Sequence, residues 1–388
     1  MKKYIFYSLV GASIQFAACS KQNNKEVFDM DLLDGFPTSE VGYEYGVSGA
    51  YAGNLNNTII LAGGCNFPEK PVYDGGEKRY YKGIYQAKVI NENSSFLEWT
   101  KIGELPNEAA YGVSVQDKDT LYFIGGNNND GQLKFTLKLF LDTKNNQLCI
   151  DTLPSLPVGI DNMSGAMHNS TIIIAGGNTE KEFSKKLFKL NLNNLNEGWS
   201  IDDSCLESSL LQSISFSLNG SFYTSSGFYS GDETKVPFVS TKTYKVVNET
   251  DCFEYQNAIE NDTLTFSGGC VVKIDEKSVY AMSGVNKKVF EAALNRIRFK
   301  DKTNIQAEKD SIDKLQNDYL RHDPNWYLFN STLYKLDTTT TSWMAVAESK
   351  HLARAGAIAV PVPNGLYLLG GELKPGVRTS KTLRIIKK

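Results

Sequence analysis

Histidine and paired cysteine are scarce in this chain of 388 residues, and their scarcity argues against several kinds of site. The three histidines, His168, His322 and His351, are scattered along the sequence and offer no cluster of metal ligands. Six cysteines are present, but no two have the Cys-x-x-Cys spacing. A zinc site or a disulfide framework is therefore not expected, although one bridge is possible in an oxidising compartment. We predict neither a metal nor a cofactor.

A strong charge of one sign is also lacking, because 44 acidic and 41 basic residues leave a formal net charge of −3. Such a chain has no broad electrostatic reason to bind nucleic acid or anionic lipid. The apolar run over residues 4–18, which follows Lys2 and Lys3, is too short for a comfortable transmembrane span. Its position and its basic flank predict an export signal instead.

The end of this run resembles the processing site of a bacterial lipoprotein. Residues 16–20 read Phe-Ala-Ala-Cys-Ser, which makes Cys19 the lipid-bearing residue; in an ordinary cleaved signal Cys19 would be incidental. We expect a signal peptide over residues 1–19 and a polar tether over residues 20–26. The expected location is the periplasm or the outer membrane of a Gram-negative bacterium, with the lipid as the only membrane contact.

Glycine and aromatic residues are plentiful, with 32 Gly, 20 Tyr and 20 Phe against 11 Pro, which favours strands and turns. An apolar strand that ends in a Gly-Gly or Ser-Gly pair recurs six times. Glycine permits the tight backbone that such a strand end requires. The spacing of about 50–60 residues, and almost 90 for the last interval, resembles kelch repeats and predicts an all-β, six-bladed kelch-type β-propeller. The six pairs are residues 63–64, 125–126, 176–177, 226–227, 283–284 and 370–371.

The two ends of the chain complement each other in this arrangement. The sixth unit has a strand over residues 381–386 after its glycine pair and then lacks an outermost strand. Residues 27–33, which precede an inner strand expected near residues 45–54, can supply it. Pairing them would close the ring and remove exposed sheet edges. We therefore predict one closed propeller over residues 27–388.

Two insertions follow glycine pairs and are expected on one common face. Residues 66–83 are basic and rich in tyrosine. Residues 285–329 carry apolar side chains three or four apart over 290–297 and 312–319, which predicts a helical insertion in the fifth blade. Amphipathic helices of this kind act more often as packing braces than as lids.

The repeat also locates a candidate site, because the residue after each glycine pair begins a loop on that same face. Glu372 is the only carboxylic acid among the six. Arg378, Lys374, Arg79 and Arg354 can reach the same bowl, which suits an anionic, hydroxylated ligand. The six equivalent residues are Cys65, Asn127, Asn178, Phe228, Val285 and Glu372.

The relation of Glu372 to Arg378 depends on the turn between them. A loop centred on Pro375 places the two side chains across from each other. A two-residue turn at Pro375 and Gly376 places them on opposite faces instead, because side chains alternate along strands. A surface hairpin with a weak exposed ion pair is the alternative without function.

The segment Gly-Gly-Glu-Leu-Lys-Pro-Gly-Val-Arg-Thr over residues 370–379 resembles the active-site segment of bacterial N-acetylneuraminate epimerases (sialic acid mutarotases). Residues 61–64, 111–114, 283–286 and 333–337 are similar to that family as well, in a cyclically permuted order. The resemblance implies Glu372 as the proton acceptor, with Arg378 as its partner. Tyr111, Arg79, Lys374 and Arg354 are candidate substrate-binding residues. Ala109 departs from the family, which often has Arg there.

The resemblance implies a mutarotase that interconverts the α and β anomers of N-acetylneuraminate by acid–base ring opening and closure. One carboxylate can move the required proton, and Arg is the natural partner of the sugar's carboxylate. A non-catalytic kelch propeller that binds a carbohydrate or protein on the same face is the main alternative. A sialidase is disfavoured because the sequence has no Ser-x-Asp-x-Gly-x-Thr-Trp boxes, and a copper oxidase because convincing His ligands are lacking.

Overall fold

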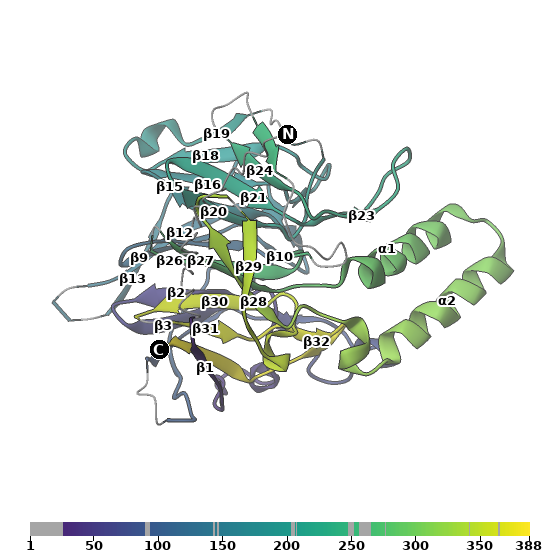
Figure 1. Ribbon diagram of the computed structural model, residues 1–388, viewed down its shortest axis with the longest axis horizontal. Coiled ribbons are helices and arrows are strands. Elements are labelled where there is room, and N and C mark those ends of the chain that lie inside the picture. Colours follow the sequence, from purple (N-terminus) through teal and green to yellow (C-terminus); the bar gives the residue numbers. More distant parts are fainter. Residues whose placement is uncertain are drawn as a thin grey trace, which may run out of the picture.

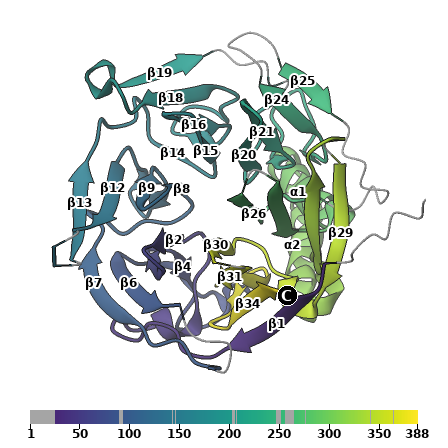
Figure 2. The ribbon, with the colours of Figure 1, turned by 60° about the vertical axis from the view of Figure 1, so that its left-hand side comes forward.

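The computed structural model is a six-bladed β-propeller with two helices on one face, as predicted (Figures 1 and 2). Cys19, the signal peptide and residues 20–25 of the tether lie outside the described residues. Glu26 is bound to the propeller through Lys335 and Lys387, with Nζ to Oε1 distances of 2.5 and 2.6 Å. The structure describes residues 26–89, 94–142, 144–145, 147–202, 206, 208–246, 252–255 (backbone), 265–275, 277–340, 342–363 and 365–388.

Each blade is a four-stranded antiparallel sheet. From the innermost strand outward, the first three blades are β2 (Tyr51–Leu55), β3 (Thr58–Ala62), β6 (Gly83–Lys88) and β7 (Thr100–Glu104); β8 (Val113–Asp117), β9 (Thr120–Ile124), β12 (Thr136–Leu141) and β13 (Leu148–Thr152); and β15 (Ser164–His168), β16 (Thr171–Ala175), β18 (Leu187–Asn191) and β19 (Trp199–Asp202). The other three are β20 (Ile214–Leu218), β21 (Ser221–Ser225), β24 (Thr243–Val246) and β25 (Cys252–Tyr255); β26 (Gly269–Asp275), β27 (Ser278–Ser283), β28 (Thr332–Asp337) and β29 (Ser342–Glu348); and β30 (Ile358–Val362), β31 (Gly365–Leu369), β34 (Thr382–Lys387) and β1 (Phe28–Leu33).

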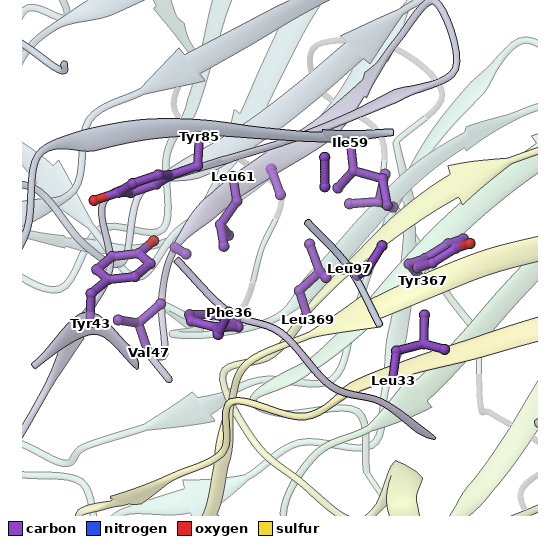
Figure 3. Packing of buried hydrophobic residues seen from close by; sticks show 14 of the residues in the cluster. Leu33, Phe36, Tyr43, Val47, Ile59, Leu61, Tyr85, Leu97, Tyr367 and Leu369 are labelled. Atoms are coloured by element: carbon purple, nitrogen blue, oxygen red, sulfur yellow. The ribbon is translucent and has the colours of Figure 1, made fainter. Parts of the chain in front are cut away.

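The two ends of the described chain pair in the sixth blade, as the sequence predicts. Strand β1 lies antiparallel to β34, with Phe28 opposite Lys387 and Leu33 opposite Thr382. Leu33 is fully buried and packs with Phe36, Tyr43 and Tyr367 in a core cluster shared by the sixth and first blades (Figure 3). The ring is therefore closed by paired backbone and by apolar packing, since both remove surface from water.

The inner strands begin later than the sequence suggests. The first was expected near residues 45–54, but residues 43–45 form a 3₁₀ turn and β2 begins at Tyr51. A residue with positive φ interrupts the extended backbone before each inner strand. Its N–H donates to the carbonyl oxygen of the equivalent residue in the neighbouring blade, and the six bonds, 2.7–3.0 Å long, form a closed ring around the propeller axis. The six residues are Gly49, Tyr111, Asn162, Gln212, Gly268 and Gly356.

The glycine pairs turn the chain onto the face that carries this ring. Both residues of every pair have positive φ, and the second is always glycine. At Gly371, for example, an added Cβ would lie 2.8 Å from the Cβ of Ala357, so a side chain does not fit. In four blades a two-stranded hairpin follows, and in the third blade the segment after the pair forms a two-stranded sheet with residues that precede the inner strand. The hairpins are β4 (Cys65–Asn66) with β5 (Arg79–Tyr80), β10 (Asn127–Asn128) with β11 (Gly131–Gln132), β22 (Phe228–Tyr229) with β23 (Phe238–Val239), and β32 (Glu372–Lys374) with β33 (Val377–Arg378). The sheet of the third blade is β14 (Ile160–Asp161) with β17 (Asn178–Thr179).

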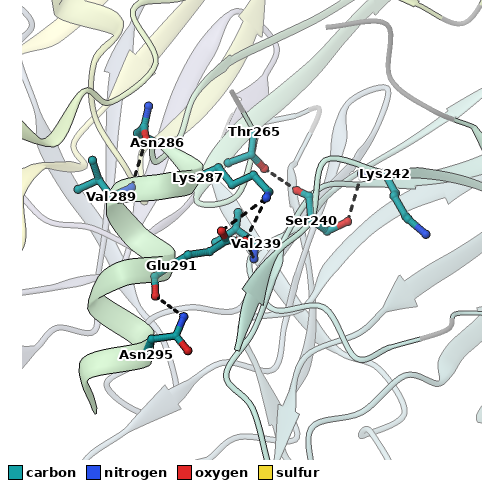
Figure 4. Close-up of polar contacts among 9 residues, drawn as sticks. All are labelled: Val239, Ser240, Lys242, Thr265, Asn286, Lys287, Val289, Glu291 and Asn295. Atoms are coloured by element: carbon teal, nitrogen blue, oxygen red, sulfur yellow. Dashed lines mark hydrogen bonds and ion pairs between the residues drawn. The ribbon is translucent and has the colours of Figure 1, made fainter. Parts of the chain in front are cut away.

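The fifth blade carries the predicted helical insertion in place of a hairpin. Helices α1 (Lys287–Lys302) and α2 (Gln306–Arg321) project from the face as an antiparallel pair (Figure 1). The Asn286 side chain caps α1 by accepting from Val289 N–H, and Glu291 accepts the N–H of Val239 from the fourth blade's hairpin (Figure 4). Among the described residues, neither helix is long and apolar enough to cross a membrane.

Candidate functional site

The β32–β33 hairpin combines both of the turn arrangements considered for Glu372 and Arg378. Lys374 pairs with Val377, so Pro375 and Gly376 form a two-residue turn. The register then shifts by one residue between Glu372 and Lys374, and Glu372 lies opposite Arg378. This β-bulge returns the two side chains to the same face, because one extra residue reverses the alternation of the strand.

Glu372 and Arg378 form a largely buried ion pair rather than a surface one. Arg378 Nη1 lies 3.1 Å from Glu372 Oε2, and the side chains are 3% and 22% exposed respectively. Glu372 Oε2 also accepts the N–H of Gly376 at 3.1 Å, which fixes the carboxylate against its own turn. The carboxylate is thus oriented by the hairpin and still reached by solvent, as a proton acceptor for a dissolved ligand must be.

The Arg378 guanidinium is held by its surroundings in the charged state. Its Cζ lies 5.2 Å from the centre of the Phe67 ring, and it lines a pocket of about 240 Å³ between the first insertion and the hairpin. Burial alone would lower the pKa of Arg378, but the charge of Glu372 and the nearby Tyr111 and Cys65 outweigh it, and the net pKa is raised. Neither Nε nor Nη1 makes an aligned hydrogen bond with a described residue.

Tyr111 is brought to this pair from the second blade. Its hydroxyl lies 3.4 Å from both the Cys65 thiol and the Ser48 hydroxyl. Burial raises the pKa of Tyr111 well above its ordinary value, and the charges of Arg378 and Glu372 also act on it. Tyr111 is therefore a neutral hydroxyl group at physiological pH, within electrostatic reach of the ion pair, and its role in substrate binding stays a prediction.

Asp161 is a second carboxylate on this face that was not predicted from the sequence. It is 1% exposed, and its Oδ2 accepts from Asn127 Nδ2 at 2.8 Å and from Gln132 Nε2 at 3.1 Å. Its Oδ1 accepts from Asn162 Nδ2 at 2.6 Å, and Gln212 donates to Asn162 at 2.9 Å. We call these five residues the amide arc. The four amide side chains around the Asp161 carboxylate offer neutral donors and acceptors of the kind that bind sugar hydroxyls.

A comparison of equivalent positions would have found Asp161. The residue that precedes each member of the backbone ring is Ser48, Ala110, Asp161, Leu211, Ser267 or Ala355, and only Asp161 is acidic. The residues that follow the glycine pairs, among which Glu372 was found, do not include Asp161.

Two of the predicted substrate-binding cations, Arg79 and Lys374, are bound to groups other than the ion pair. Arg79 pairs with the exposed Glu69 at 2.9 Å and donates to the Val41 carbonyl oxygen at 3.1 Å. Lys374 Nζ donates to the His322 carbonyl oxygen at 2.9 Å. The structure thus brings Tyr111 to the ion pair, whereas the polar ends of Arg79 and Lys374 are bound to other groups.

Arg354 lies below the face rather than on it. Its side chain is among the largest fully buried ones, and burial lowers its pKa to about 10. Its Nε donates to the carbonyl oxygen of His351 at 3.0 Å, and its Nη1 to those of Gly370 and Lys381 at 2.9 and 3.0 Å. Arg354 therefore stabilises the strand ends that carry the site hairpin.

Replacing Arg354 by methionine should destabilise the protein and leave ligand recognition intact. Arg354→Met leaves three buried carbonyl oxygens without a donor, so we expect a loss of about 1–3 kcal/mol of unfolding free energy. Urea unfolding followed by circular dichroism measures this, with the exposed Arg321→Met as the control. An unchanged stability with weaker ligand binding would instead place Arg354 in the site.

The helical insertion reaches the site at the end of α2. The pKa of Tyr319 is raised by burial, by Tyr327 and by the charge of Glu372. Arg321 pairs with Asp74 of the first insertion, with 2.8 Å between Nη2 and Oδ1. The insertion thus connects the site hairpin to the first insertion. Across the described part of the chain, no three His, Cys, Asp or Glu side chains gather as metal ligands would.

Comparisons with known proteins identify the family of this chain. The profile of the family described as NANM, N-acetylneuraminate epimerase, matches residues 14–150 and 153–387. The N-acetylneuraminate epimerase of Salmonella arizonae is 26% identical over 235 residues, which cover 61% of this chain and 58% of that protein. That of Vibrio vulnificus is 25% identical, with 59% and 57% covered.

A solved structure, the structure of YjhT, has the same fold. It matches with a TM-score of 0.50 and 20% identity over 61% of this chain and 67% of that chain. The order of the segments, which the sequence predicts to be cyclically permuted, stays a prediction. Since the family profile covers almost the whole described chain, this protein belongs to the N-acetylneuraminate epimerase family.

Proposed function

We propose that this protein is a mutarotase that interconverts the α and β anomers of N-acetylneuraminate, with Glu372 as its acid–base group. The observation that carries the proposal is the buried, bulge-aligned Glu372–Arg378 pair on the ring face of a chain that belongs to this family. The relatives at 25–26% identity bear the epimerase name for themselves. The proposal is that this protein has the activity that their name states.

The chemistry needs one group that can accept and return a proton. Glu372 takes the proton of the anomeric hydroxyl, whose O–H electrons form the carbonyl bond. The bond from the anomeric carbon to the ring oxygen breaks, and that oxygen takes a proton from water or from Glu372. Rotation about one carbon–carbon bond and the reverse steps close the ring on the other face. The net change is an isomerisation.

The neighbouring residues support this step by position. Arg378 and the Gly376 N–H hold the Glu372 carboxylate on one side, so that its other lone pairs face the ligand. Tyr111 can donate its hydroxyl proton to a sugar oxygen, and the amide arc can bind hydroxyl groups. Binding and orientation of this kind complement general acid–base catalysis, which contributes about 10²–10⁴-fold.

The test is the rate of anomer exchange on freshly released sugar. A sialidase that releases α-N-acetylneuraminate is added, then removed by filtration, and the decay of the α signal is followed by NMR in dilute buffer. We expect decay that quickens in proportion to protein concentration. Decay at the buffer rate, combined with saturable sugar binding, would favour the non-catalytic binding module, and absence of both would reject each candidate.

Export and lipidation are separate proposals, because they depend on residues outside the described range. We propose that Cys19 carries the lipid and that the propeller acts on the exported side of a membrane. Mass spectrometry of the N-terminal peptide tests this, and an unmodified Cys19 in the mature protein contradicts it.

A further inference from the structure

We infer that Lys78 is the cation that binds the carboxylate of the sugar and so makes the site selective for acidic sugars. Lys78 lies at the end of the first insertion and is exposed. The inference deepens the proposed function and rests on it, since it concerns the same ligand at the same face. The sequence places Lys78 in the basic first insertion but does not distinguish it from the other cations there.

The charge balance of the face gives the first reason. Arg378 is already paired with Glu372, so the pair as a unit carries no net charge toward an anion. An acidic sugar therefore needs a further cation, because its carboxylate would otherwise approach Glu372 against repulsion. A cationic side chain that is already bound to a carboxylate or a carbonyl oxygen must break that contact before it can bind the carboxylate of the sugar.

Three other cations near the face have such contacts. Arg79 is bound to Glu69, and Lys374 to the His322 carbonyl oxygen. Arg321 is bound to Asp74. Lys78 and Lys70 make no ion pair and no hydrogen bond with any residue that the structure describes, and of these two Lys78 is the one that lies over the Tyr111 ring. All three of its ammonium protons are available to a ligand.

The position of Lys78 gives the second reason. Its Nζ lies 5.3 Å from the centre of the Tyr111 ring and 5.7 Å from that of Tyr80. Cation–π attraction of this kind holds an ammonium group in place without neutralising it. Tyr111 in turn senses the charges of Arg378 and Glu372. Lys78 is thus held over Tyr111, the residue on which the charges of the ion pair act.

The chemistry of the ligand follows from these two observations. The site presents a carboxylate for proton transfer, the neutral Tyr111 hydroxyl and the amide arc for hydroxyl groups, and the ammonium group of Lys78 for an anionic substituent. A monosaccharide with a carboxylate attached beside its anomeric carbon matches this set. In this proposal Lys78 determines specificity by binding the sugar's carboxylate, whereas Glu372 transfers the proton.

The test compares N-acetylneuraminate with its methyl ester, which has the same ring but no charge. Michaelis constants for anomer exchange and dissociation constants from NMR titration are measured for wild type, Lys78→Met and Lys78→Arg. The control is Lys88→Met, which removes the same charge at the other end of the first blade, where Lys88 pairs with Thr58. Circular dichroism checks that all variants fold.

We expect wild type to bind the acid more tightly than the ester by about tenfold or more, as one charge-assisted contact provides. Lys78→Met should remove that preference by weakening the binding of the acid alone, while kcat changes little. Lys78→Arg should restore most of it, and Lys88→Met should resemble wild type.

Two results would overturn the inference. If Lys78→Met retains the preference for the acid, or weakens the binding of acid and ester equally, Lys78 does not bind the carboxylate. The mutarotase proposal is then unaffected. If wild type neither binds nor exchanges either sugar, the proposed function itself fails, and the role of Lys78 fails with it.

Discussion

Glu372→Gln is expected to lower the rate of anomer exchange by about 10²–10⁴-fold, the usual contribution of general acid–base catalysis. Glutamine keeps the size of the side chain and an oxygen that can accept the Gly376 N–H, but it cannot take a proton from the anomeric hydroxyl. Substrate affinity should change far less than kcat, because the binding groups stay in place. The measurement is the NMR decay of the α anomer at saturating sugar.

The matched control is Glu233→Gln. Glu233 belongs to the fourth blade's hairpin loop on the same face, and its side chain is 97% exposed. The same chemical change there should leave kcat at the wild-type value. If Glu372→Gln exchanges the anomers as fast as wild type, Glu372 is not the acid–base group, whatever the protein binds.

Glu372→Gln should also destabilise the fold, by about 3–5 kcal/mol, the usual effect of removing one partner of a buried ion pair. The Arg378 guanidinium is 3% exposed and would lose its only carboxylate partner among the described residues. The double variant Glu372→Gln/Arg378→Met removes the unpaired guanidinium charge and should regain at least about 1 kcal/mol of unfolding free energy. Urea unfolding of the four proteins gives this double-mutant cycle.

This coupling separates structure from catalysis. The double variant should recover stability without recovering anomer exchange, since the proton acceptor is still absent. If the two single effects add to within about 0.5 kcal/mol, the pair is not coupled and the hairpin holds Arg378 by other contacts. Activity of Glu372→Gln must therefore be measured at a temperature where circular dichroism shows the protein to be folded.

The backbone plan of this protein could be predicted because it repeats. Each glycine pair ends a strand whose neighbours have the same period, and the missing sixth outer strand matched residues 27–33, now β1. The two helices followed from apolar spacing. Strand starts were less accurate, because the positive φ of Gly49 and Tyr111 depends on hydrogen bonds to neighbouring blades that no local pattern encodes.

The site could be predicted only in part. Glu372 was found from its equivalent position, but its alignment with Arg378 depends on a one-residue bulge that has no signature in Leu373 or Pro375. Arg354 looked like a binding residue because the sequence shows its charge and hides its burial. Lys78 could not be singled out from the sequence, because folding brings the ionic partners of Arg79, Lys374 and Arg321 near them and the sequence does not show which cations have such partners.

The most direct test of the central claim is magnetisation exchange between the NMR signals of the two anomers of N-acetylneuraminate at equilibrium. This experiment needs no releasing enzyme, and it detects interconversion without any net reaction. We predict exchange that rises in proportion to wild-type protein and stays at the buffer level with Glu372→Gln. Exchange at the buffer level with folded wild-type protein, or equal exchange with the variant, would contradict the assignment of Glu372 as a mutarotase acid–base group.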